Sequence, residues 1–198
     1  PTDISDPEYF HKVVDCQYAC PAHTPVPEYI RLIASGNYTD AYMINWESNV
    51  FPGVLGRTCD RPCKPACRRV RVEDEPVAIC RLNRVAADYK DDIKDFIPKA
   101  PEKSNGKKIA LLGAGPVSLA VARDLIPLGY ECTAYERDPV PGGLMRTNIP
   151  SFRFKIINSL VPISIALFAN SSIVEKQNSG YSSYRSQVWQ ETSRGGLP

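Results

Sequence analysis

The sequence predicts a helical domain organised by cysteines, followed by the start of an α/β domain. Six of the seven cysteines lie between Cys16 and Cys80. Residues 97–108 are rich in Pro, Lys, Ser and Gly, which is typical of a linker. Beyond them, a short apolar run, a glycine turn, a helical pattern and a second apolar run predict a βαβ unit. We therefore expect domains at residues 1–100 and 101–155, and a divergent or non-native tail at residues 156–198.

Helical patterns dominate the first domain. Residues 25–36 carry Pro27 in a first-turn position and end at Gly36, and residues 38–49 would form a second short helix. Residues 75–92 open with the helix-start signal Glu75-Pro76 and continue with helical apolar spacing. Residues 51–69, between these helices, are full of turn formers. A metal or cluster would supply the core that such a loop lacks.

Composition argues against several classes of protein. The chain has 198 residues and a formal net charge of +2, so charge predicts no attraction to nucleic acid or membranes. The longest apolar run is too short to span a bilayer and contains Pro162, and no signal peptide is recognisable. Seven is an odd number for a disulfide framework. Cytoplasmic metal or cluster ligation is therefore favoured over disulfides or unrelated buried thiols.

Five cysteines follow two spacing patterns, C-x3-C-P at Cys16 and Cys20 and C-x3-C-x3-C at Cys59, Cys63 and Cys67. The first pattern matches the end of the bacterial ferredoxin run. Thiolates are soft ligands that suit iron–sulfur clusters or zinc. Structural zinc usually takes C-x2-C pairs, which this chain lacks, although His11 and His23 keep a zinc site open.

Basic residues surround the central cysteines, at Arg57, Arg61, Lys64, Arg68, Arg69 and Arg71. A cluster held by four thiolates carries net negative charge, so nearby cations would stabilise it. A nucleic-acid patch is the alternative interpretation. It is the weaker one, because the loop has no stacking aromatic residues and the overall charge is close to balanced.

The segment GAGPVS has the features of a dinucleotide-binding loop. Gly113 would permit the tight turn, and Gly115 and Pro116 would let a pyrophosphate approach the helix N-terminus. Ser118 is small enough for close packing of helix on strand. Glu136 ends the next strand, where its carboxylate would accept hydrogen bonds from ribose hydroxyls.

Three segments resemble the N-terminal cluster domain of the glutamate synthase small subunit. They are CQYACPAHTPVPEYIRLIASGNYTDAY, NVFPGVLGRTCDRPCKPACRR and DEPVAICRLNR. The same domain opens dihydropyrimidine dehydrogenase and related flavoprotein oxidoreductases. The resemblance covers about residues 10–153. It implies a helical [4Fe-4S] domain followed by a Rossmann-like FAD-binding domain, with NAD(P)H as the electron source in the complete enzyme.

The resemblance also implies metal ligands. Cys20, Cys59 and Cys63 match three ligands of one cluster. The family's fourth ligand is a polar side chain that matches Asn83, and Cys80 lies one turn earlier on the same face as a second candidate.

A second cluster is less complete. Cys16 and Cys67 match two of its ligands, but Glu8 and His11 stand where the other two cysteines are expected. Leu55 also replaces a cysteine that usually precedes GRTC. We therefore expect one [4Fe-4S] cluster, which Cys16 or Cys67 could join, with two clusters as the alternative.

The GGL segment of the family lies along the flavin dinucleotide and matches Gly142, Gly143 and Leu144. Arg146 is a candidate to neutralise a phosphate, or is a solvated arginine. Cys132 falls mid-strand and is expected to be inert core. We found no family pattern after residue 153, so the FAD domain is expected to be incomplete.

The function implied is electron transfer from NAD(P)H through FAD and [4Fe-4S] to a partner subunit, such as a large glutamate synthase-like subunit. No catalytic residue is expected, because the cofactors carry the chemistry. Two alternatives stay open. One is a non-catalytic interaction module stabilised by a metal, and the other is an NAD-binding dehydrogenase whose cysteines are incidental.

Overall fold

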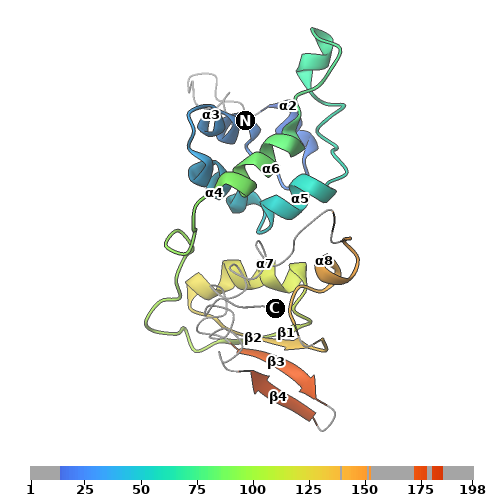
Figure 1. The fold of residues 1–198 in the computed structure, drawn as a ribbon. Coiled ribbons are helices and arrows are strands. Elements are labelled where there is room, and N and C mark those ends of the chain that lie inside the picture. Colours follow the sequence, from blue (N-terminus) through green and yellow to red (C-terminus); the bar gives the residue numbers. More distant parts are fainter. Residues whose placement is uncertain (1–13, 139, 151, 153–171, 178–179, 185–198) are drawn as a thin grey trace. The chain divides into compact units, whose positions relative to one another are not determined.

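The computed structural model describes residues 14–138, 140–150, 152, 172–177 and 180–184 (Figure 1). The chain divides into two compact units, Pro1–Ile93 and Lys94–Pro198, and each is described by itself. This division lies a few residues before the boundary expected near residue 100. No helix among the described residues has the length and apolar character of a membrane span.

The first unit is helical. Its elements are α2 (Asp15–Ala19), α3 (Val26–Ala34), α4 (Tyr38–Ser48), α5 (Pro52–Thr58), the 3-10 helix η1 (Arg68–Arg71) and α6 (Ile79–Tyr89). Helix α6 is central, because it packs against α3, α4 and α5 (Figure 1). The core contains Tyr29 from α3, Tyr42 and Trp46 from α4, and Ala86 from α6. The helical character predicted for this domain is therefore confirmed.

Two elements of this unit differ from the sequence prediction. Helix α6 begins at Ile79 and not at the Glu75-Pro76 signal. Residues 51–69, expected to be irregular, contain α5 and η1. Pro52 occupies the first turn of α5, where its missing N–H costs nothing, and Val54 and Gly56 are buried. Packing against α6 thus turns a segment rich in turn formers into a helix.

The second unit begins with the expected βαβ pattern. Strand β1 (Lys108–Leu112) runs parallel to β2 (Glu131–Glu136), with Lys108 opposite Glu131. Between them lie α7 (Pro116–Leu125) and the 3-10 helix η2 (Ile126–Leu128), which ends at Gly129 with φ +84°. Leu119 and Ala122 of α7 are buried, and α7 contacts β2. A short helix, α8 (Leu144–Thr147), follows.

Two more strands extend this sheet. Strand β3 (Ser172–Gln177) pairs with β2 in parallel, and β4 (Gly180–Tyr184) pairs with β3 antiparallel, so the order is β1-β2-β3-β4 (Figure 1). Neither β3 nor β4 was among the elements predicted from the sequence, because the periodicity of this region is weak and serines are frequent in it. The remainder of the tail lies outside the described residues.

Candidate functional site

Four cysteine thiols come together in the first unit from separate elements. Cys20 caps the end of α2, and Cys59 caps the end of α5. Cys63 lies in the loop after α5 and is buried, and Cys80 is the second residue of α6. We call these four thiols the cysteine quartet. Helix ends hold three of the four, so the packing of short helices sets their positions.

Cys63 interacts with every other member of the quartet. Burial raises its pKa to about 11, and the charges of the neighbouring thiols add to the rise. These thiols belong to Cys80, Cys59 and Cys20. Burial and the charges of three neighbouring thiols thus both disfavour the Cys63 thiolate. A cationic metal group is the kind of ligand that would relieve this repulsion.

Cys80 lies near Cys59 and Arg61. Burial and then the Cys59 charge raise the pKa of Cys80, and the positive charge of Arg61 opposes the rise. The Arg61 backbone N–H also donates to Cys59 Sγ at 3.3 Å. Arg61 adopts φ +64°, which is uncommon for a residue with a side chain.

Cys20 lies in a different local environment. Burial raises the pKa of its thiol, but hydrogen bonds outweigh burial and leave the pKa below its usual value. The donors are the backbone and hydroxyl of Thr24, with Sγ and Oγ1 3.6 Å apart, and the neighbouring backbone amides. Donors aimed at a sulfur favour its thiolate, the form that binds iron.

Tyr29 lies among the thiols. Its side chain is fully buried, and its hydroxyl donates to the Ile79 carbonyl at 3.3 Å. Burial raises its pKa, and the charges of Cys63, Cys80, Cys16 and Cys20 raise it further. Tyr29 therefore stays neutral and provides an apolar wall beside the quartet. The sequence analysis missed this role, because a tyrosine on an apolar helix stripe carries no signal beyond core packing.

Cys16 and Cys67 form a separate pair. Burial raises the pKa of Cys16, and the Cys67 charge is the second cause. Cys67 is buried at the start of η1. Cys16 also acts on Tyr29 together with Cys63, Cys80 and Cys20, so this pair lies near the quartet.

Other predicted ligands lie elsewhere. Glu8 and His11 fall outside the described residues. His23 is exposed, and its Nδ1 lies 3.2 Å from the Gln17 carbonyl oxygen. Asn83 lies one turn after Cys80 on α6, and its buried Oδ1 has no hydrogen-bond partner among the described residues.

Only part of the expected basic shell faces the quartet. Arg61 does so directly, as described above. Arg68 pairs with Asp15, and Arg69 pairs with Glu73. Arg57 forms a two-pronged contact with Asp88 at 2.6 and 2.8 Å, which joins α5 to α6. Arg57, Arg68 and Arg69 therefore form ion pairs within this unit, whereas the Arg61 backbone N–H donates to the Cys59 sulfur of the quartet.

The quartet fits a [4Fe-4S] cluster on the chemistry of its donors. It offers four soft thiols. The Arg61 N–H donates to Cys59 Sγ, Cys20 Sγ lies 3.6 Å from Thr24 Oγ1, and hydrogen bonds to sulfur tune iron–sulfur clusters. A single zinc ion would need sulfurs about 3.8 Å apart, given Zn–S bonds of about 2.3 Å in a tetrahedron. Among the described residues, no three His, Cys, Asp or Glu side chains are placed to hold one metal ion. A cluster instead presents a different iron to each thiolate.

The glycine loop of the second unit is built by two close backbones. Gly113 has φ +90°, and its N–H donates to the Tyr135 carbonyl at 2.7 Å. Gly115 caps α7, and the Gly142 N–H donates to the Ala114 carbonyl at 2.8 Å. A Cβ on Gly143, which has φ +48°, would lie 3.0 Å from Gly115 Cα. The GGL segment thus packs directly on the GAG loop, and Gly143 has no room there for a Cβ.

Glu136 makes backbone hydrogen bonds that its predicted role at a ribose did not include. Its carboxylate is buried and accepts from the Ala114 N–H at 2.7 Å. It also accepts from the backbone N–H groups of Arg137 at 2.7 Å and Asp138 at 3.1 Å. Glu136 therefore ties the end of β2 to the glycine loop. A carboxylate has about four acceptor positions, so one remains for a ribose hydroxyl.

The other predicted nucleotide residues surround this loop. Pro116 is the first residue of α7 and Ser118 is half-buried on it. Leu144 and Arg146 are both exposed on α8, where they could reach a bound molecule. Cys132 is buried in β2, which agrees with the core position expected for it.

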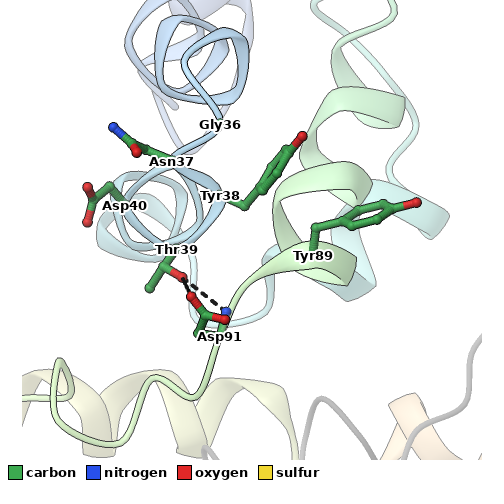
Figure 2. Close-up of a pocket in the computed structure, with 7 residues that line it drawn as sticks. All are labelled: Gly36, Asn37, Tyr38, Thr39, Asp40, Tyr89 and Asp91. Carbon is green, nitrogen blue, oxygen red and sulfur yellow. Dashed lines mark hydrogen bonds between the residues drawn. The ribbon is translucent and has the colours of Figure 1, made fainter.

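A pocket of about 170 Å³ lies where α4 begins and the chain leaves α6 (Figure 2). Its lining residues are Gly36, Asn37, Tyr38, Thr39, Asp40, Tyr89 and Asp91. Thr39 Oγ1 donates to Asp91 Oδ2 at 3.2 Å and accepts from the Asp91 N–H at 3.0 Å. These bonds fasten the end of α6 to α4. The pocket contains none of the predicted site residues.

Comparison with known proteins identifies relatives of both parts. Residues 10–95 match the family model described as dihydropyrimidine dehydrogenase domain II, 4Fe-4S cluster. Residues 150–198 match a second model, glutamate-cysteine ligase family 2. This second family was not recognised from the sequence, and the divergent or non-native tail expected at residues 156–198 stays a prediction.

Three curated relatives are similar over most of this chain. The NADPH-Fe(3+) oxidoreductase subunit beta of Geobacter sulfurreducens is 37% identical over 77% of this chain and 24% of its own length. The glutamate synthase [NADPH] small chain of Mycobacterium tuberculosis is 34% identical over 71% of this chain and 28% of its own length. The NAD-dependent dihydropyrimidine dehydrogenase subunit PreT of Salmonella typhimurium is 37% identical over 70% of this chain and 33% of its own length.

These matches confirm the resemblance inferred from the cysteine and glycine motifs. An alignment over 77% of the chain is longer than the first unit, so it includes part of the second. The chain spans about a quarter to a third of the length of these relatives.

Proposed function

Since residues 10–95 match a 4Fe-4S domain family and the chain is similar to subunits of several oxidoreductases, we propose that it carries electrons in an NAD(P)H-dependent iron–sulfur flavoprotein oxidoreductase. The observation that carries the proposal is the convergence of the cysteine quartet. Four thiols from three helix ends and one loop share a partly buried space. An iron–sulfur cluster bound there would accept and release single electrons.

Cys20, Cys59 and Cys63 would hold three corners of this cluster. Thr24 and the Arg61 backbone would donate hydrogen bonds to sulfur, which lowers the cost of holding negative charge. Tyr29 would exclude water on one side, because its ring is fully buried beside the thiols. A cluster held by thiolates would require reduced cysteines, so we place the protein in a reducing compartment such as the cytoplasm.

The second unit would bind the adenine dinucleotide part of FAD. Gly113, Gly115 and Pro116 would leave the N-terminus of α7 open to the pyrophosphate. Gly142 and Gly143 would form the opposite wall, with Leu144 and Arg146 exposed beside it. FAD would supply the link between a two-electron donor and a one-electron acceptor.

Partners are proposed from the relatives. The Geobacter and Mycobacterium proteins are named as a beta subunit and a small chain. We propose that this chain likewise passes electrons to a partner subunit, for which a large glutamate synthase-like subunit is the leading candidate. NAD(P)H would be the electron source in the complete enzyme.

Metal analysis with spectroscopy tests the cluster. The chain purified without oxygen should contain about four irons and four sulfides and absorb broadly in the visible range. Cys20→Ser should lose most of that iron, whereas Cys132→Ser, at a buried thiol in the other unit, should retain it. A colourless preparation that contains zinc would reject the proposal in favour of a metal-stabilised interaction module.

Flavin binding is tested separately. Titration of FAD into the full chain should quench flavin fluorescence, and Gly115→Val should abolish the effect by filling the space before α7. NAD should compete only weakly with FAD for binding to the chain. Tight NAD binding without FAD binding would instead favour a plain dehydrogenase fragment.

A further inference from the structure

We propose that Thr39 and Asp91 form a latch that holds the chain against α4 at the point where it leaves the first unit. The segment concerned, residues 89–93, begins with the last residue of α6, and we call it the exit strap. The division between the two units falls directly after this strap, between Ile93 and Lys94. The latch therefore determines whether the joint between the units begins at Lys94 or already at the end of α6.

One hydroxyl group makes both bonds of the latch (Figure 2). Thr39 Oγ1 donates to Asp91 Oδ2 at 3.2 Å and accepts from the Asp91 N–H at 3.0 Å. These two bonds hold the side chain and the backbone of Asp91 at the same time. Thr39 is the second residue of α4, and a β-branched side chain in a helix has few rotamers. Its hydroxyl is therefore a well-defined attachment point for the strap.

Two ring contacts accompany the latch. The ring centres of Tyr89 and Tyr38 are 5.5 Å apart, and Lys90 Nζ lies 5.2 Å from the centre of the Tyr42 ring. Three successive residues of the exit strap thus each contact a different residue of α4. Ile93, at the end of the strap, is buried. The strap is therefore attached along its length to the helix that α6 already packs against.

The exit strap nevertheless has the features of a segment that opens locally. The pocket of about 170 Å³ is lined by residues of both the strap and the start of α4, so the two are not packed tightly there. The Tyr89 side chain is 69% exposed, and the latch bonds lie at the exposed surface. Segments with exposed hydrogen bonds and few buried apolar contacts open at free energies well below that of global unfolding. The two latch bonds should therefore determine how often the strap detaches.

A detached strap would lengthen the joint between the units. Residues 90–93 would then belong to the flexible connection, and a longer connection widens the range of positions that a tethered unit can take. Electron transfer from FAD to the cluster requires the two units to meet, so this use of the latch rests on the proposed function. The latch itself depends on neither cofactor.

Limited digestion of the full chain with chymotrypsin, followed by mass spectrometry, measures the opening. Cleavage after Tyr89 requires the strap to detach, whereas Phe152, exposed in the second unit, provides an internal reference. Thr39→Val removes both bonds at nearly constant size and should raise the cleavage rate after Tyr89 about tenfold relative to that after Phe152. Thr39→Ser retains the hydroxyl and should match the unchanged chain. Equal rates after Tyr89 in these two variants would overturn the proposal.

Cleavage after the buried residues Tyr42 and Trp46 reports unfolding of the whole first unit. It should not change in Thr39→Val, and a rise parallel to that at Tyr89 would show that Thr39 stabilises the fold without acting as a latch. Asp91→Ala loses one bond and keeps the backbone N–H bond, so it should give an intermediate rate and provides the test if Thr39→Val fails to fold. An Asp91→Ala rate equal to that of the unchanged chain would contradict the side-chain part of the latch.

Iron content and FAD binding are measured on the same preparations. A chain that binds neither iron nor FAD would contradict the proposed function, whatever the cleavage rates are. A chain that binds both cofactors but shows no effect of Thr39→Val at Tyr89 would contradict the latch alone.

Discussion

Gly56 on α5 lies against the backbone of α6, so close that a Cβ at this position would sit 3.1 Å from the carbonyl oxygen of Cys80. The same Cβ would meet the Arg84 backbone nitrogen at 3.0 Å and its Cγ at 2.9 Å. Cys59 follows three residues later at the end of α5. The absence of a side chain at Gly56 therefore sets how near Cys59 comes to Cys80.

Gly56→Ala should weaken both folding and cluster binding. Helix propensity favours alanine by about 1 kcal/mol, but overpacking against a helix backbone costs about 1–3 kcal/mol. The cost of overpacking should exceed the gain in helix propensity, because two of the three contacts are backbone atoms that cannot rotate away. Iron content and the thermal midpoint of unfolding measure the two effects.

Gly106→Ala provides the control for that change. Gly106 has φ +77°, but a Cβ there would meet nothing within 4 Å, and the residue lies in the second unit. Gly106→Ala should lower the stability through backbone strain and leave the iron content unchanged. A Gly56→Ala protein with normal iron and higher stability would contradict the packing argument.

The pair Cys16 and Cys67 should be dispensable for the cluster. The Cys16→Ser, Cys67→Ser double variant should keep about four irons per chain, because the quartet supplies a complete ligand set without them. Iron and sulfide analysis beside the visible spectrum provides the measurement. About eight irons in the unchanged chain, falling to about four in the double variant, would mean that a second cluster exists.

Glu136→Gln should loosen the glycine loop even without nucleotide. The carboxylate accepts three backbone N–H bonds, and the amide NH2 of glutamine would face one or more of these donors. Leaving a buried donor unpaired costs about 1–3 kcal/mol. Hydrogen exchange at the Ala114 amide should therefore become faster.

Glu131→Gln on the same strand is the matched control for this change. Glu131 is half-exposed and forms only a 3.8 Å pair with Lys108, so exchange at Ala114 should stay as it was. Equal rates of hydrogen exchange at the Ala114 amide in both variants would contradict the role of Glu136 in holding the glycine loop and leave only its predicted contact with ribose.

Gly143→Ala should weaken FAD binding at least about tenfold, which corresponds to about 1.4 kcal/mol. The new Cβ would meet Gly115 Cα at 3.0 Å, and φ +48° is unfavourable for alanine. The GGL segment would move away from the glycine loop that forms the other wall. Isothermal titration of FAD into the full chain, with Gly106→Ala as control for a positive φ, measures the change. Equal affinities in the two variants would remove GGL from the proposed site.

Sequence patterns alone identified much of this molecule. Pro27 and Gly36 located α3, because backbone dihedral preferences act locally. The βαβ unit was predicted for the same reason, since an apolar strand, a glycine turn and a helix follow one another without interruption. Cysteine spacing likewise indicated a cluster domain, and the family match confirmed it.

Tertiary structure decided what depends on distant parts of the chain. Cys80 is 17 residues beyond Cys63 and follows no ligand spacing, yet the packing of α5 on α6 brings it to Cys59. Glu136 was recognisable as a strand-end acid, but only the fold turned its carboxylate toward the backbone of the glycine loop. Helix α5 exists because α6 buries it. These relationships arise from contacts between elements, and local preference does not encode such contacts.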